Sequence, residues 1–186
     1  MPNIADAKIL IIATDGFEQV ELTTPKDKLT QAGATVHVAS PDGQAIKGWY
    51  FDRWGDDITV DSKIADTDLS NYDAVVLPGG QINPDVLRAD ETTVTKIRDY
   101  AATGKPLAAI CHAPWLLIEA DLVRGKRLTS FKSIRTDLRN AGAEVVDEMV
   151  AQDGNLITSR NPDDLDAFVK AVIDSVEKGT SAQDAA

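Results

Sequence analysis

The single cysteine of the chain, Cys111, is the residue best suited to covalent chemistry. It directly follows an apolar segment, 106–110, that we expect to be a strand, and it precedes a helical stretch that starts near His112. At such a junction the positive end of the helix dipole and unpaired backbone N–H groups favour the thiolate over the thiol. We therefore expect a lowered thiol pKa and a nucleophilic sulfur that peroxide also oxidises. A buried structural cysteine is the alternative.

The adjacent His112 is a candidate general base or acid, because the ordinary pKa of histidine lies near neutral pH. Adjacent side chains often diverge, so the alternative is a histidine that only caps or packs at the helix start. The other histidine, His37, lies in a predicted strand at 34–40, and we interpret it as structural.

Two further strand ends are expected to lie beside Cys111, because the carboxyl ends of parallel strands meet at one edge of a sheet. The strand predicted at 8–14 is followed by an acidic loop, in which Glu18 and Glu21 are both candidates for a hydrogen bond to the sulfur. Each of the two could instead be a solvated loop acid.

A pair of glycines, Gly79 and Gly80, follows the strand predicted at 73–78. Glycines let backbone N–H groups approach a ligand closely, as an oxyanion-binding site requires. A tight turn is the structural alternative for this pair.

Short apolar runs alternate with helix-like stretches, which predicts a parallel sheet with helices on both faces. We expect one three-layer α/β domain over 1–178 and a frayed tail over 179–186. The segment 44–60 is interpreted as a hairpin or an excursion rather than a helix, and a hairpin is predicted between 144–151 and 155–158. Helices are predicted over 25–32, 91–103, 112–120, 132–141 and 161–177.

Composition excludes several classes of protein. The chain has 186 residues and a net charge of −11, which disfavours binding to nucleic acid or to a membrane by bulk charge. One cysteine permits neither an intrachain disulfide nor a cysteine-rich zinc cluster, and we expect no metal and no cofactor. The N-terminus does not resemble a signal peptide and no apolar run is long enough to cross a membrane, so we expect a cytoplasmic protein.

Four segments together resemble the PfpI-type intracellular cysteine proteases of the ThiJ/PfpI superfamily, which includes the parkinsonism-associated deglycase. The resemblance covers about residues 8–176. It implies a flavodoxin-like sandwich that forms a homodimer or a larger homo-oligomer, with Cys111 at a nucleophile elbow. The matching segments are 13–22, 76–80, 109–114 and 158–164.

The resemblance also implies roles for single residues. Glu18 matches the glutamate that contacts the cysteine sulfur, and Gly80 with the His112 amide matches the oxyanion-binding positions. Asp85 matches an acid that orients the histidine across a subunit interface, in a loop that is about one residue longer here. Two further departures are Ala113 in place of the usual glycine and the aromatic segment 47–57, which we expect to line the pocket, a subunit interface or a satellite core.

Two functions share this predicted site. The first is a stress-defence hydrolase in which the Cys111 thiolate attacks peptides, or the adducts that methylglyoxal and glyoxal form on proteins, as the resemblance implies. The second is an oxidative-stress sensor in which Cys111 passes to sulfenic or sulfinic acid. Glutamine amidotransfer, which the related class I fold performs with a downstream histidine, is nearly excluded because no histidine follows His112.

Overall fold

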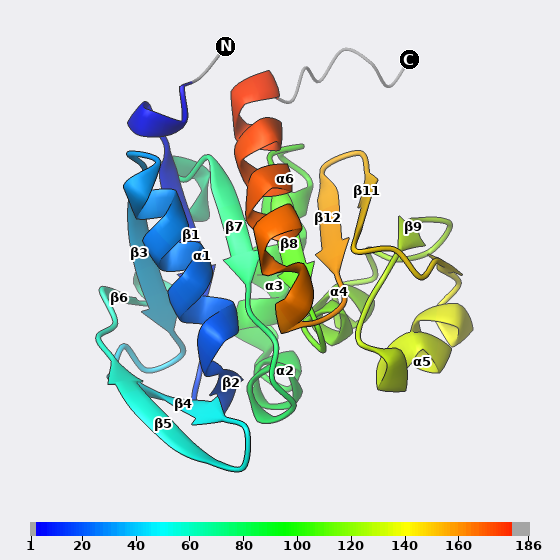
Figure 1. Cartoon of the computed structure of the whole chain (residues 1–186), viewed down its shortest axis with the longest axis horizontal. Coiled ribbons are helices and arrows are strands. Elements are labelled where there is room, and N and C mark those ends of the chain that lie inside the picture. The colour runs from blue at the N-terminus through cyan, green and yellow to red at the C-terminus, as the bar shows by residue number, and fades with distance from the viewer. Residues whose placement is uncertain (1–2, 180–186) are drawn as a thin grey trace.

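A seven-stranded sheet forms the centre of the computed structural model, which describes residues 3–179 (Figure 1). In chain order its strands are β1 (Lys8–Ile12), β3 (Thr35–Ser40), β6 (Ser62–Lys63), β7 (Ala74–Leu77), β8 (Leu107–Ile110), β11 (Val150–Asp153) and β12 (Leu156–Ser159). Their spatial order is β11–β12–β8–β7–β1–β3–β6, and all neighbours are parallel except β11 and β12. The predicted α/β fold with a mostly parallel sheet is confirmed.

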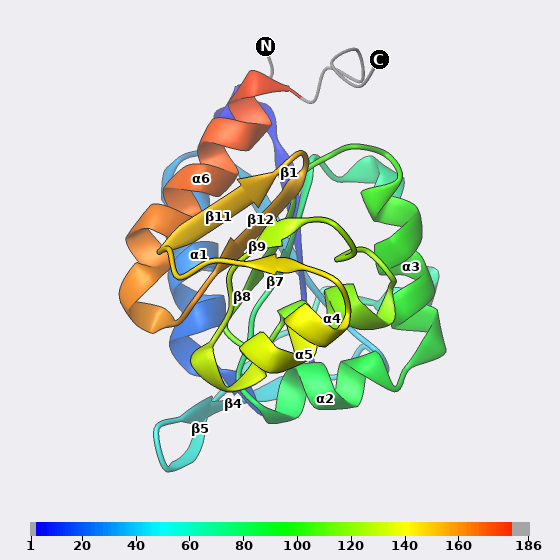
Figure 2. The ribbon, with the colours of Figure 1, turned by 90° about the vertical axis from the view of Figure 1, so that its right-hand side faces the viewer.

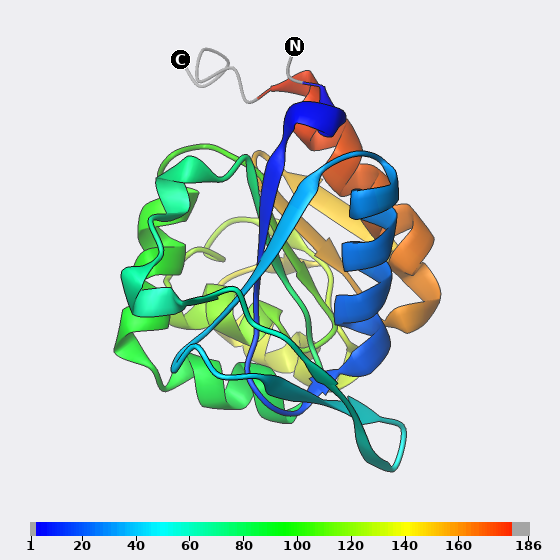
Figure 3. The ribbon, with the colours of Figure 1, turned by 90° about the vertical axis from the view of Figure 1, so that its left-hand side faces the viewer.

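Helices cover both faces of this sheet (Figures 2 and 3). One face packs against α1 (Gln19–Gln31) and α6 (Leu165–Lys178). The other packs against α2 (Ile82–Arg88), α3 (Glu91–Ala101), α4 (Pro114–Glu119) and α5 (Arg135–Asn140). In β1, Ile9 and Ile11 enter the first core while Leu10 and Ile12 enter the second, as the alternation of strand side chains requires.

Smaller elements lie outside the main sheet. A hairpin of β4 (Ile46–Tyr50) and β5 (Arg53–Ile58) pairs with β2 (Phe17–Glu18), so the hairpin is the correct one of the two alternatives for 44–60. It projects from the rest of the chain in Figure 3. The second predicted hairpin exists as β11 and β12, but its first strand is shorter, because β10 (Glu144–Val145) pairs with β9 (Arg127–Leu128) instead. Five 3-10 turns complete the chain: η1 (Ile4–Asp6), η2 (Ile64–Asp66), η3 (Leu69–Asn71), η4 (Lys132–Ile134) and η5 (Pro162–Asp164).

Two helices differ from the prediction. Helix α1 starts at Gln19 rather than at 25, so Pro25 lies inside it and is buried. A proline loses only its own N–H bond and packs its ring, which a helix held by tertiary contacts tolerates. Helix α2, which spans only seven residues and contains Pro84, was not predicted.

The boundaries of the described region affect two expectations. The frayed tail was predicted over 179–186. Gly179 caps the end of α6, and residues 180–186 lie outside the described part of the chain. Within residues 3–179 no helix combines the length and the apolar character that a membrane crossing needs.

Candidate active site

Cys111 stands at a strained elbow between β8 and α4. Its φ is +64°, a left-handed conformation that residues with a side chain rarely adopt. Backbone hydrogen bonds hold it there: its N–H donates to the Ser159 carbonyl at 3.0 Å, and the Phe131 N–H donates to its own carbonyl at 2.9 Å. The thiol is buried, with 5% of the residue exposed. This geometry matches the nucleophile elbow that the resemblance implied.

His112 contacts the sulfur directly. Its Nδ1 lies 3.1 Å from Cys111 Sγ, and its Nε2 lies 3.0 Å from Ser133 Oγ. The ring stacks on Phe131, with centroids 4.7 Å apart, and meets Trp115 edge-on at 5.4 Å. Burial lowers the pKa of His112, so the imidazole is neutral at neutral pH and can accept a proton.

The carboxyl beside the sulfur belongs to Glu21, which corrects the assignment of that contact to Glu18. Glu21 is fully buried in the first turn of α1, and its Oε2 accepts from the Gly79 N–H at 2.9 Å. A Cβ on Gly79 would touch both this oxygen and Cys111, so the carboxyl lies beside the cysteine. Glu18 precedes the helix and is only half-buried, which raises its pKa. Because α1 starts at Gln19, Glu18 lies just before the helix, and the side chain that points inward from its first turn is that of Glu21.

Glu21 is a protonated acid at neutral pH. Burial raises its pKa to about 8, and hydrogen bonds from Cys111 and the Gly79 amide only partly offset this effect. Its Oε1 is buried without a hydrogen-bond partner among residues 3–179.

The thiol does not have the lowered pKa that the helix start alone predicts. Burial and the nearby Glu21 carboxyl raise the pKa of Cys111, while backbone N–H groups of Gly80 and His112 act in the opposite direction. Burial thus disfavours the charged forms of both Cys111 and His112.

The two glycines lie where the sequence placed them, against the sulfur. A Cβ on Gly79 would come within 2.6 Å of both Cys111 Cβ and Glu21 Oε2. Gly80 has a φ of +77°, and a Cβ there would approach the Glu18 backbone nitrogen to 2.5 Å. Only glycine fits this close convergence of loops.

Asn83 ties these loops together and was missed by sequence reasoning. It is fully buried, its Oδ1 accepts from the Thr14 N–H at 2.8 Å, and its Nδ2 donates to the carbonyls of Pro78 at 2.8 Å and Gly79 at 3.1 Å. Asn83 is a polar residue in a helix that was not predicted, so no sequence pattern indicated that its side chain is buried.

Asp85 lies on α2 and is exposed. Within residues 3–179 the hydrogen-bond partner of His112 Nε2 is Ser133, and Asp85 makes no hydrogen bond to the imidazole. A role for Asp85 at this histidine therefore requires a second copy of the chain.

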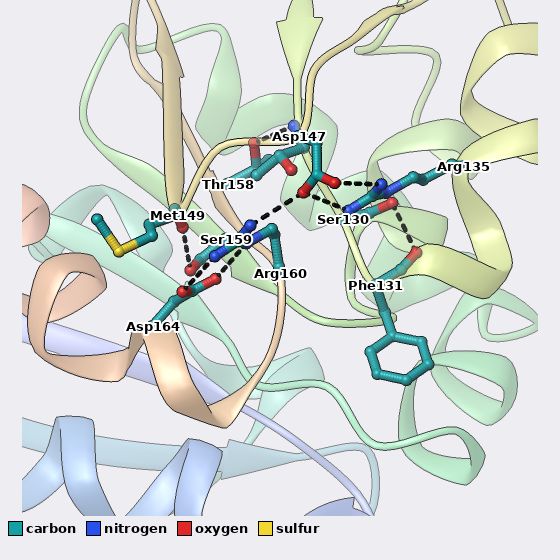
Figure 4. A network of polar contacts seen from close by, with 10 residues as sticks. Ser130, Phe131, Arg135, Asp147, Met149, Thr158, Ser159, Arg160 and Asp164 are labelled. Carbon is teal, nitrogen blue, oxygen red and sulfur yellow. Dashed lines mark hydrogen bonds and ion pairs between the residues drawn. The ribbon is translucent and has the colours of Figure 1, made fainter.

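An ionic network fixes the segment that carries Phe131 and Ser133 (Figure 4). Asp147 accepts two hydrogen bonds from Arg135, at 2.7 and 3.0 Å, and one from Arg160 at 3.0 Å. Arg160 in turn donates twice to the buried Asp164. The two arginines hold the pKa of Asp147 near 2, so the network stays ionised at neutral pH.

A cavity of about 410 Å³ opens beside this network. Phe131 forms part of its wall and also stacks on His112, so the cavity adjoins the reactive pair. Its lining residues are Phe131, Lys132, Arg135, Asp147, Arg160 and Asn161.

Several known proteins are similar to this chain in sequence and in fold. The profile of the DJ-1/PfpI family matches residues 7–175. The chain is 44% identical over 163 residues to protein/nucleic acid deglycase 2 of Escherichia coli, covering 87% of this chain and 92% of the relative. It is 39% identical over 166 residues to deglycase TK1284 of Thermococcus kodakarensis, covering 89% and 97%. The crystal structure of Drosophila melanogaster DJ-1beta has a TM-score of 0.83 at 31% identity and covers 93% of this chain and 95% of that one. With matches over nearly its whole length, the chain belongs to the DJ-1/PfpI family.

Proposed function

We propose that the protein is a stress-defence cysteine hydrolase whose substrates are peptides or the adducts of methylglyoxal and glyoxal on proteins. The observation that carries the proposal is the 3.1 Å contact between Cys111 Sγ and His112 Nδ1 at a strained elbow. The two deglycase relatives, which carry that name, support the glycated class of substrate.

The geometry supports one sequence of steps. His112 Nδ1 takes the thiol proton, and the sulfur electron pair attacks the carbonyl-type carbon of the substrate. We assign the oxyanion to the Gly80 and His112 backbone N–H groups, because they already favour negative charge at the sulfur. The imidazolium then protonates the leaving amine, and water releases the product from the sulfur. Glu21, protonated below a pH of about 8, keeps the thiolate free of a competing charge.

A substrate panel tests the proposal. Peptides, glyoxal-modified amino acids and free glyoxals are incubated with the wild type and with Cys111→Ser, and product is quantified. We expect turnover of one class by the wild type and none by Cys111→Ser, because a serine hydroxyl is a far weaker nucleophile at this position. Equal turnover by both proteins would exclude the cysteine mechanism.

An oxidation sensor is the second candidate. The observation that favours it is the protonated Glu21 beside the sulfur, because a carboxylic acid can donate a hydrogen bond to a sulfenate or sulfinate. With one cysteine in the chain, reduction would depend on a thiol from another molecule.

A further inference from the structure

His112 has a partner at each ring nitrogen. A neutral imidazole carries one N–H and one lone pair, so the partner of Nε2 determines what Nδ1 can do. The partner of Nε2 in the chain is the Ser133 hydroxyl, at 3.0 Å. A serine hydroxyl can donate or accept a hydrogen bond. Which of the two Ser133 does depends on whether the ring proton is on Nε2, and therefore on what Nδ1 does at the sulfur.

Nδ1 faces a thiol. For the Cys111 proton to pass to Nδ1 across this 3.1 Å contact, as the proposed function requires, Nδ1 must present a lone pair, and the ring proton is then on Nε2. Ser133 then accepts this N–H. Ser133 is exposed, so its own hydroxyl proton is free to point toward water.

We infer that Ser133 is a positioning residue whose oxygen accepts the Nε2–H of His112 and keeps Nδ1 free to take the Cys111 proton. In that transfer the S–H bond breaks, its electron pair stays on sulfur, and an N–H bond forms at Nδ1. The imidazolium still donates to Ser133 through Nε2, so the contact is kept in both charge states. This inference deepens the proposed function and rests on it for its catalytic meaning.

The segment that carries Ser133 is anchored to the site. The Phe131 N–H donates to the Cys111 carbonyl, and the Phe131 ring stacks on His112. On the other side of Ser133, Arg135 is held by Asp147. Both anchors fix the position of the Ser133 hydroxyl relative to the sulfur. An exposed serine on a loop without such contacts would not be held in this way.

Ser133 is not a substitute for the acid expected from a second copy. A hydroxyl selects the tautomer of a histidine without adding charge, whereas a carboxylate such as Asp85 would raise the pKa of the imidazole. The two contributions therefore change different observables.

The test uses three variants of the full chain: Ser133→Ala, Ser133→Thr, which keeps the hydroxyl, and Thr136→Ala. Thr136 is an exposed hydroxyl residue of the same segment that makes no hydrogen bond to His112, so its variant controls for local loosening. Histidine ring ¹⁵N shifts report the tautomer, and the chain has only His37 besides His112. Intact-mass measurement of iodoacetamide alkylation reports Cys111, the only cysteine.

We expect the Nε2–H tautomer in the wild type, in Ser133→Thr and in Thr136→Ala. In Ser133→Ala we expect a mixture of tautomers and alkylation about fivefold slower near pH 7. An unchanged tautomer in Ser133→Ala, or equal slowing by Thr136→Ala, would overturn the inference. Neither readout needs turnover, so failure here leaves the hydrolase proposal standing, and failure of the substrate panel leaves this assignment standing.

Discussion

Glu21 and the Cys111 thiol are two acidic groups buried side by side, and this environment disfavours a negative charge on either of them. Burial raises the pKa of each, and the charge of one disfavours the charge of the other. In the proposed mechanism the site therefore depends on His112 to form the nucleophile.

Stability should fall with pH because of Glu21. The folded protein keeps this proton up to a pH of about 8, whereas the unfolded chain loses it near 4.5, so the folded state binds more protons in between. Its contribution is complete below pH 4.5 and declines by up to about 1.4 kcal/mol per pH unit above it. Urea denaturation from pH 5 to 8 should show this decline in the wild type, most of it in Glu18→Gln, whose own pKa is raised less, and only a small part of it in Glu21→Gln. A Glu21→Gln protein with the wild-type slope would contradict the raised pKa.

Peroxide should distinguish the sulfurs if the site stabilises an oxidised cysteine. Met149 is 56% exposed and Cys111 is 5% exposed, so access alone favours the methionine. Under graded peroxide we expect oxygen addition at Cys111 first, located by peptide mass analysis. Earlier or equal oxidation of Met149 would count against the sensor function.

At the scale of elements, the site is a meeting of loops that follow β1, β7 and β8. Asn83 bonds the first loop to the second, and the Glu18 N–H donates to the Gly79 carbonyl at 3.3 Å. The loops are close enough that a methyl group cannot be added between them.

A matched pair of glycines tests this convergence. Gly80 and Gly104 have nearly the same φ, +77° and +76°, but a Cβ on Gly104 would meet nothing within 4 Å. Gly104→Ala should lose only the left-handed strain, about 1 to 2 kcal/mol. Gly80→Ala should lose clearly more in urea denaturation and should also lose reactivity at Cys111, because backbone atoms would have to move. Equal losses would mean that the loops are not tightly packed.

At the scale of the whole molecule, we expect a homodimer or larger homo-oligomer in which Asp85 acts on the histidine of a second copy. Mixing Cys111→Ser with Asp85→Asn chains tests this. If Asp85 acts across the interface, each mixed dimer has one intact site, and random mixing restores about a quarter of the wild-type sites. Wild-type activity of Asp85→Asn alone would place Asp85 outside the site, and no recovery after subunit exchange would contradict its action across the interface.

Much of the fold was predictable because its signals are local. Short apolar strands, helix starts and the glycines at strand ends indicated a mostly parallel sheet and brought Cys111, Gly79 and Gly80 to one edge. The missed helix α2 was not predictable in this way, since it is held by the burial of Leu87 and by the contacts of Asn83 rather than by its own pattern.

The sequence by itself determined the candidate nucleophile, its histidine neighbour and the layered fold, because these depend on residue type and on short-range periodicity. The tertiary structure decided which acid faces the sulfur, Glu21 rather than Glu18, and which hydroxyl meets His112. A helix that starts six residues earlier than expected turns a different side chain inward, and Ser133 is 22 residues beyond Cys111 in the chain. Contacts of this kind arise only when packing sets the phase of a helix and the path of a loop.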